Sequence, residues 1–290
     1  MIWLTGNKGM LGTELSLLFE RNNMVFTGTD IEIDITDPAA LKDFTSGRSI
    51  KYIVNCSAYT AVDKAEDERE RCRLLNTVGP ANIAAVARAI NAKLIHISTD
   101  YVFNGCSHRP YTEEDLTDPT GVYGLTKRDG EIKVLENNAN SYIIRTAWLY
   151  GKHGNNFVHT MLGLMKERKC VSVVNDQWGS PTWTQDLSQA IITFIRLAEE
   201  EKTIPYGIYN FTNEGEITWF DFAREIYSQG RSRDIITNDC EVKPCASSEF
   251  PSKVKRPAYS ALDKTKIKKT LRIDIPLWDT SLGKFLSEIA

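Results

Sequence analysis

The segment TGNKGMLG at residues 5–12 follows directly after a short apolar run, MIWLT, and leads into a helical pattern of apolar residues. Glycines at such a strand-to-helix turn let backbone N–H groups and the positive end of the helix approach a pyrophosphate. The spacing G-x-x-G-x-x-G departs from the G-x-G-x-x-G of the standard dinucleotide fingerprint, and a plain strand-to-helix turn is the alternative. Its position after the first strand favours dinucleotide binding. The candidate cofactor contacts in the turn are Gly6, Lys8, Gly9, Met10, Leu11 and Gly12.

Short apolar runs continue to alternate with helical patterns through the first half of the chain, at residues 24–30, 51–58, 92–99 and 141–150. This alternation is typical of β-α-β units, so we expect a doubly wound parallel sheet of the Rossmann type. The second half is mixed, with strand patterns at 170–176 and 207–213 and an amphipathic helix at 185–198. We predict a dinucleotide-binding domain at 1–150 with returning segments at about 170–213. A smaller mixed α/β substrate-binding lobe would comprise 151–169 and 214–290.

The composition limits the kinds of partner that we expect the protein to bind. With 290 residues, 42% hydrophobic and 25% charged, the chain is an ordinary globular protein, and a net charge of −3 gives no reason to expect nucleic acid. Its six cysteines form no C-x-x-C pair and its four histidines form no H-E-x-x-H motif, so we expect reduced thiols in a cytoplasm and no histidine-based metal centre. We find neither a secretory signal nor an apolar run long enough to span a bilayer, so no membrane partner is expected.

Asp30 ends the second strand pattern, at the distance beyond the glycines where an acid meets an adenosine ribose. A carboxylate there favours NADH, because it would repel the 2′-phosphate of NADPH. The alternative is a solvated loop aspartate. Asp34 and Ile35 follow, and we expect them to flank the adenine.

Hydroxyl groups gather at the end of the strand pattern at 92–99, which closes with STDYVF. Ligands of open parallel sheets bind outside these carboxyl ends, so Thr99 is a candidate to hold a reacting carbonyl. In YGLTK at 123–127, Tyr123 and Lys127 share one helical face. A nearby cation lowers a tyrosine pKa from near 10 and makes the phenol a better acid at neutral pH. The alternative for Thr99 is a turn residue at a strand end, and the alternative for Tyr123 and Lys127 is a pair on the surface of a helix. Gly124, which is unfavourable within a helix, suggests close packing beside the site.

The strings TGxxGxxG, STDYVF and YGxTK, in this order, resemble the extended short-chain dehydrogenase/reductase superfamily. Longer strings, including NCSAYTAVDKAE at 55–66, IIRTAWLYG at 143–151, VVNDQWGSPT at 173–182 and RPAYSALD at 256–263, resemble the dTDP-4-dehydrorhamnose reductase family within it. The resemblance implies reduction of the C4 ketone of a dTDP-4-dehydro-L-rhamnose by NADH or NADPH. Thr99 would hold the carbonyl, Tyr123 would donate the proton, and Lys127 would lower the tyrosine pKa and bind the nicotinamide ribose.

The same resemblance implies further contacts. Ala58 and Tyr59 would lie against the cofactor. The residues on the side of the dTDP-sugar would be Asp100, Tyr101, Trp148, Asn155, Phe157, Gln177 and Arg256. Arg256 suits the diphosphate because a guanidinium matches phosphate geometry. Some family members hold magnesium at a homodimer contact through glutamates, and no glutamate of this sequence can be assigned to that site.

Two other functions remain open at this point. One is another nucleotide-sugar short-chain enzyme, either a 4-epimerase that returns the hydride to the same sugar or a reductase of a sister 4-keto-6-deoxy sugar. The other is a non-catalytic nucleotide-binding subunit that resembles the methionine adenosyltransferase β-subunit. Thr99, Tyr123 and Lys127 together favour a catalyst.

Overall fold

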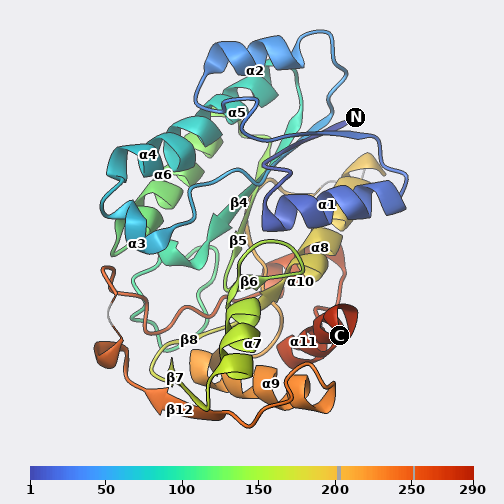
Figure 1. Cartoon of the computed structure of the whole chain (residues 1–290). Helices are drawn as coiled ribbons and strands as arrows, with labels where there is room; N and C mark the ends of the chain where they lie inside the picture. Colours follow the sequence, from blue (N-terminus) through green and yellow to red (C-terminus); the bar gives the residue numbers. More distant parts are fainter. Residues whose placement is uncertain (201–203, 251) are drawn as a thin grey trace.

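A six-stranded parallel sheet forms the centre of the computed structural model, which describes residues 1–200, 204–250 and 252–290 (Figure 1). In spatial order its strands are β10 (Gly207–Asn210), β5 (Ser141–Thr146), β4 (Lys93–Thr99), β3 (Tyr52–Asn55), β1 (Ile2–Thr5) and β2 (Phe26–Thr29). All neighbouring pairs run parallel. The order reverses at β1, with β2 on one side and β3 on the other, and such a switch point is where these sheets bind ligands. The predicted Rossmann-type fold is confirmed.

Helices cover both faces because each strand sends alternate side chains to opposite faces. Ile2 and Leu4 pack in a core with α1 (Met10–Arg21), α8 (Thr184–Glu199) and α10 (Thr265–Leu271). Trp3, between them in the sequence, packs on the opposite face with α2 (Pro38–Thr45), α5 (Gly79–Ala89) and α6 (Val122–Asn137). Figure 1 shows α1 and α8 on one side of the sheet and α5 and α6 on the other.

A smaller lobe with its own core follows the carboxyl end of β5. Its helices are α7 (Phe157–Glu167), α9 (Trp219–Ser232) and α11 (Trp278–Ile289), which gather below the sheet in Figure 1. Its strands form three pairs: β6 (Leu149–Tyr150) with β9 (Thr182–Trp183), β8 (Trp178–Gly179) with β11 (Ile217–Thr218), and β7 (Cys170–Val174) with β12 (Glu241–Cys245). The remaining short elements are α3 (Val62–Ala65), α4 (Arg69–Arg73), the π-helical η1 (Leu74–Val78) and the 3-10 turns η2 (Asp100–Val102) and η3 (Ser247–Glu249).

The segment predicted to return to the first domain at about 170–213 does so only in its later part. α8 and β10 join the main sheet and its core, whereas β7 pairs with β12 in the smaller lobe. Burial alternates along β7, while β1 and β3 are buried throughout, so β7 suits a small sheet with one exposed face. We therefore assign β7 to the smaller lobe. The other predicted boundaries, at 1–150, 151–169 and 214–290, stay a prediction.

Helix starts follow the local chemistry of the sequence in two places. Asp37 caps α2 by accepting a hydrogen bond from the N–H of Ala39, and a proline follows at the first helical position. Thr218 begins α9 with a capping box shared with Asp221. α9 runs on past Gly230 to Ser232. A Cβ at Gly230 would come within 2.9 Å of Ile236, so this glycine serves close packing.

Candidate active site

The glycine turn forms a tight cradle at the switch point of the sheet. Gly6 has φ +68°, and a Cβ there would lie 2.8 Å from the backbone nitrogen of Ser57, just beyond β3. A Cβ at Gly12 would overlap the carbonyl oxygen of Gly6, so α1 starts in direct contact with the turn. These positions admit only glycine without backbone movement. The cradle therefore fits the backbone approach that a pyrophosphate requires.

The N-terminus of α1 leaves its first-turn N–H groups without side-chain caps. Gly9 is the N-cap, offers no side chain, and no acid stands in the first turn. Orphan amides and the helix dipole at such an end favour an anion. Lys8 and Gly9 are exposed, Met10 is half-buried, and Leu11 is buried in the core. The turn thus has the donors and the open face that a dinucleotide needs.

The three residues predicted for the adenosine side, Asp30, Asp34 and Ile35, differ in their surroundings. Asp30 follows β2 and its N–H donates to Glu32 (2.9 Å), while Glu32 also pairs with Lys8 (3.3 Å). Asp34 is exposed and accepts two hydrogen bonds from Thr36, so it closes a local turn. Ile35 is 5% exposed and packs beneath Gly79, where a Cβ would meet its Cδ1 at 2.5 Å. Ile35 is thus a core residue, whatever it adds to the adenine pocket.

Ala58 and Tyr59 lie beyond the carboxyl end of β3, and Asn76 holds the backbone there. The Asn76 side chain accepts from the Tyr59 N–H (2.8 Å) and donates to the Tyr59 carbonyl (3.0 Å). Asn76 is fully buried in η1. Sequence reasoning missed this residue, because nothing in the surrounding string LNTVGPANIA at 75–84 signals the contact.

Thr99, Asp100 and Tyr123 meet at the carboxyl end of β4. The Thr99 hydroxyl donates to Asp100 (3.0 Å) and accepts from the N–H of Tyr101 (3.3 Å), which fixes it at the start of η2. A hydrogen bond with Thr99 lowers the pKa of Tyr123. The Tyr101 and Tyr123 rings meet edge to face, 5.5 Å between centroids. Two predicted hydroxyl groups are thus brought together from a strand and a helix.

The expected lowering of the Tyr123 pKa by Lys127 is not found. Burial is the largest influence and raises the pKa of Tyr123. The Asp100 carboxyl raises it further, and a hydrogen bond with Thr99 lowers it. Lys127, 2% exposed, instead donates to the carbonyl oxygen of Ile97 (2.6 Å). Burial lowers the pKa of Lys127 to about 8, because a charged ammonium is disfavoured away from water. The phenol therefore stays protonated at neutral pH.

A buried ion pair behind these residues was also missed. Glu131 and Arg145, from α6 and β5, form two hydrogen bonds of 2.9 and 2.7 Å, and Glu131 accepts a third from Ser98 at 2.5 Å. A helical pattern marks charged residues as solvent-facing by default, so only the fold reveals that both side chains are 3% exposed.

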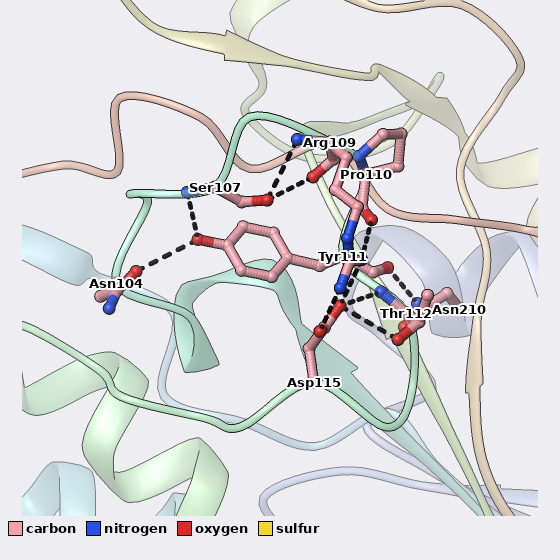
Figure 2. Close-up of polar contacts among 8 residues, drawn as sticks. All are labelled: Asn104, Ser107, Arg109, Pro110, Tyr111, Thr112, Asp115 and Asn210. Atoms are coloured by element: carbon pink, nitrogen blue, oxygen red, sulfur yellow. Dashed lines mark hydrogen bonds and ion pairs between the residues drawn. The ribbon is translucent and has the colours of Figure 1, made fainter.

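The loop between η2 and α6, residues 103–121, ties the strand end to the C-terminal segment. Figure 2 shows Tyr111 at its centre, hydrogen-bonded to Asn104 and Ser107, with Asp115 held by Arg109 and Thr112. The backbone of Tyr111 bonds to Ala261 and Asp263. The loop therefore fixes the segment that follows Arg256.

The predicted sugar-side residues come from separate elements. Trp148 has φ +47° and stacks on Trp219 at 3.6 Å between centroids, with Phe157 4.5 Å from Trp219. A left-handed tryptophan is strained, and such strain concentrates at functional sites. Gln177 is buried and Asn155 is exposed before the N-cap Asn156. Trp219 was not predicted as a site residue, and its place beside Trp148 depends on the tertiary fold.

Arg256 extends toward the first domain. It pairs with Asp63 of α3 at 3.2 Å, and its charge lowers the pKa of Tyr101 against burial, which raises that pKa to about 12. Its buried Nε has no hydrogen-bond partner among the described residues. Arg256 therefore lies near enough to Tyr101 for its charge to act on the phenol.

Asp100 provides a prediction on stability. Burial raises its pKa from 3.8 to about 6, against hydrogen bonds from Ser260 and Thr99 that lower it. The folded state therefore binds more protons between about pH 4 and 6, and stability falls as pH rises through that window. We expect Asp100→Asn to raise the free energy of unfolding at pH 7 by about 1–3 kcal/mol, with a smaller gain at pH 5. Urea unfolding at both pH values measures this, and Asp43→Asn, exposed on α2, is the control. An equal gain at both pH values would contradict the assignment.

We searched the described residues for a metal-binding cluster and for a membrane-spanning helix. Across residues 1–200, 204–250 and 252–290, no three His, Cys, Asp or Glu side chains gather in a way that could hold a metal ion. Within those residues, no helix is both long and apolar enough to cross a membrane. Magnesium and a homodimer stay predictions.

Comparison with known proteins gives consistent matches. A family model described as the RmlD substrate binding domain matches residues 1–290. The dTDP-4-dehydrorhamnose reductase of Streptomyces griseus is 42% identical over 269 residues, covering 92% of this chain and 86% of the relative. The dTDP-4-keto-6-deoxy-D-glucose reductase of Streptomyces niveus is 38% identical over 283 residues, covering 97% and 94%.

A solved structure extends the match to the fold. The dTDP-4-dehydrorhamnose reductase of Bacillus anthracis, in complex with NADP, superposes with a TM-score of 0.91 at 36% identity, covering 99% of this chain and 98% of that one. The predicted resemblance is thus confirmed over the length of the chain. The chain belongs to the family of the dTDP-4-dehydrorhamnose reductases.

Proposed function

We propose that this protein reduces the C4 ketone of dTDP-4-dehydro-L-rhamnose to dTDP-L-rhamnose with NADH or NADPH. The observation that carries the proposal is the place of Tyr123 beside the end of β4. Its ring meets that of Tyr101 at 5.5 Å between centroids, the Tyr101 N–H donates to Thr99, and the glycine cradle lies at the same edge of the sheet. A ketone reductase needs a hydrogen-bond donor and a proton donor on one oxygen, next to a dinucleotide site.

Separate residues of the chain bind the coenzyme, hold the ketone oxygen and donate the proton. Gly6, Gly9 and Gly12 with the first turn of α1 hold the pyrophosphate, and Asp30 holds the adenosine ribose. When bound, the nicotinamide supplies the hydride. The Thr99 hydroxyl bonds the ketone oxygen, and Tyr123 gives that oxygen its phenolic proton, so the product is an alcohol.

The pKa directions suit reduction. Because burial raises the pKa of Tyr123, the phenol holds its proton until the ketone oxygen becomes basic. We assign Lys127, buried on the same helix, to the nicotinamide ribose.

The polar end of the substrate would meet the smaller lobe. The buried Nε–H of Arg256 has no acceptor within the described part of the chain, which supports a contact with the diphosphate. Trp148, held face to face by Trp219, offers a flat apolar surface for the sugar. Asp100, Tyr101, Asn155, Phe157 and Gln177 would complete the pocket.

The coenzyme is proposed as NADH or NADPH. The Asp30 carboxylate would repel a 2′-phosphate. Lys8, however, pairs with Glu32, which also accepts the N–H of Asp30, so a cation lies on the same side. The Bacillus anthracis relative was solved with NADP. A second candidate function is reduction of a sister 4-keto-6-deoxy sugar, favoured by the Streptomyces niveus relative at 38% identity.

Parallel assays test these proposals. Purified protein would be given dTDP-4-dehydro-L-rhamnose or dTDP-4-keto-6-deoxy-D-glucose, with NADH or NADPH, each with and without magnesium. We expect stoichiometric loss of the reduced coenzyme with the first sugar. Turnover confined to the second sugar would select the sister reductase. Product without net oxidation would indicate an epimerase, and binding of coenzyme without turnover on either sugar would indicate a regulatory subunit.

A further inference from the structure

The buried face of α6 carries a charged network directly beneath the proposed catalytic groups. Glu131 accepts hydrogen bonds from Ser98 of β4 and from two nitrogens of Arg145 in β5. Ser98 and Arg145 lie opposite each other in the sheet, so one carboxylate holds two neighbouring strands to the helix. Nothing in the proposed reaction uses Glu131 or Arg145 directly.

Lys127 lies one helical turn before Glu131 and is fastened to the same strand. Its ammonium donates to the carbonyl oxygen of Ile97, the residue before Ser98, at 2.6 Å. Side chains four residues apart on a helix are neighbours, so Glu131 and Lys127 face β4 together. The two attachments hold Ile97 and Ser98, and Thr99 is the next residue. The helix that carries Tyr123 is thus fixed to the strand end that carries Thr99.

This network is costly for a purely structural feature. Buried ion pairs lose hydration that their mutual attraction only partly restores, and apolar residues of similar size often stabilise a protein as well. Arg145 also leaves its Nη1 buried without a hydrogen-bond partner among the described residues, and its Cζ lies 5.0 Å from the centroid of the Phe103 ring. An unmatched donor adds to the cost. The pair therefore points to a role beyond holding the core.

We propose that Glu131 is a positioning residue that keeps the Lys127 ammonium charged and fixes α6 against β4, so that Tyr123 and Thr99 stay on one reacting oxygen. Arg145 balances Glu131 and limits its effect on Lys127. The expected effect of Glu131 on kcat rests on the proposed function, in which Lys127 takes part. The electrostatic part, by contrast, concerns the ligand-free protein alone.

The charges around Lys127 give the direction of each effect. Burial lowers the pKa of Lys127 to about 8, and Glu131 is the largest opposing influence, followed by Cys56 beyond β3 and Cys72 of α4. His96 of β4 is fully buried, and burial, with Lys127 next, lowers its pKa, so this ring is neutral at pH 7. Tyr123 also stays neutral there, since its own pKa is raised. Glu131, partnered by Arg145, is therefore the carboxylate that favours the ammonium.

Two substitutions should move the titration of Lys127 in opposite directions. Glu131→Gln removes the carboxylate and leaves Arg145 as an extra cation, so Lys127 should lose its proton about one pH unit lower than in the unmodified protein. Arg145→Met leaves Glu131 free to pair with Lys127, so the loss should come at higher pH by a similar amount. Simple loss of packing would not reverse its sign between the two variants.

The titration is followed without ligand by NMR of protein with 13C-labelled lysine, reading the Cε signal that disappears in Lys127→Met. The alkaline limb of the kcat profile is then compared with it. Opposite shifts in both measurements support the proposal. Unchanged or same-direction NMR titrations overturn it. Opposite NMR shifts with no turnover in any protein would leave Glu131's effect on Lys127 standing and remove the proposed function instead.

A milder variant covers the case in which the ion-pair variants do not fold. Ser98→Ala removes one hydrogen bond to Glu131 while keeping both charges. We expect kcat to fall about tenfold, with the coenzyme Kd and the Lys127 titration unchanged, because only the fixation of α6 is weakened. Ser98→Thr, which keeps a hydroxyl, should recover part of the loss. A Ser98→Ala protein with the kcat of the unmodified protein would refute the fixation of α6 by Glu131.

Discussion

Replacing Tyr123 by phenylalanine should lower kcat by at least ~10²-fold, the usual scale for losing a general acid. The substitution deletes one oxygen and keeps the ring that packs against Tyr101 and the cluster around Tyr59. The cofactor cradle lies on other elements, so the Kd of NADH or NADPH should stay within about twofold. Turnover is measured by coenzyme oxidation at saturating sugar, and the Kd by fluorescence titration without sugar.

Tyr101→Phe is the matched control for that experiment. It removes a hydroxyl from the neighbouring ring, 5.5 Å away between centroids, which we place beside the sugar and assign no proton transfer. Its expected effect is a rise in KM with a loss of kcat below about tenfold. If the two variants lost kcat equally, or if Tyr123→Phe turned over like the unmodified protein, the assignment of Tyr123 as the acid would be wrong.

The residues that sequence could predict are those whose chemistry is local. The glycines at positions 6, 9 and 12 follow a strand within a few residues, so their turn is visible in one short string. Thr99 and Tyr123 are 24 positions apart, yet each belongs to a short motif with a defined place on a strand or helix. Parallel topology then brings the two elements together. The fold class depends on the same local alternation, which explains why it was predicted correctly.

The residues that sequence reasoning missed depend on packing between distant elements. Glu131 reads as a solvated helical acid, and only its burial against β4 and β5 shows otherwise. Trp219 reaches Trp148 across 71 positions, through the fold of the smaller lobe. The pKa of Tyr123 was predicted in the wrong direction because a helical spacing shows the nearby cation but not the loss of water. Desolvation is a property of the whole fold, and it outweighs one neighbour here.

Substitution of Gly124 should lower kcat and stability more than any other change outside the reacting groups. Close packing was expected there, and the structure confirms it: a Cβ at Gly124 would overlap the carbonyl oxygen of Tyr101 and come within 3.0 Å of Pro119. The obstacle is backbone, so it cannot rotate away. In Gly124→Ala, α6 must move back from η2, and Tyr123 moves with it away from Thr99.

We expect Gly124→Ala to lower kcat by about 10- to 100-fold, because a displacement of about 1 Å is enough to spoil an aligned proton transfer. We also expect it to lower the free energy of unfolding by about 1–3 kcal/mol, the usual cost of overpacking, although alanine favours a helix by about 1 kcal/mol over glycine. Gly163→Ala in α7 is the control, since the added Cβ meets no described atom within 4 Å apart from its chain neighbours and the backbone of its own helix. That control should gain up to about 1 kcal/mol in urea unfolding and keep its kcat. A Gly124→Ala protein that matched it in both measurements would show that α6 and η2 can separate without cost, and that the fit between them does not align the acid.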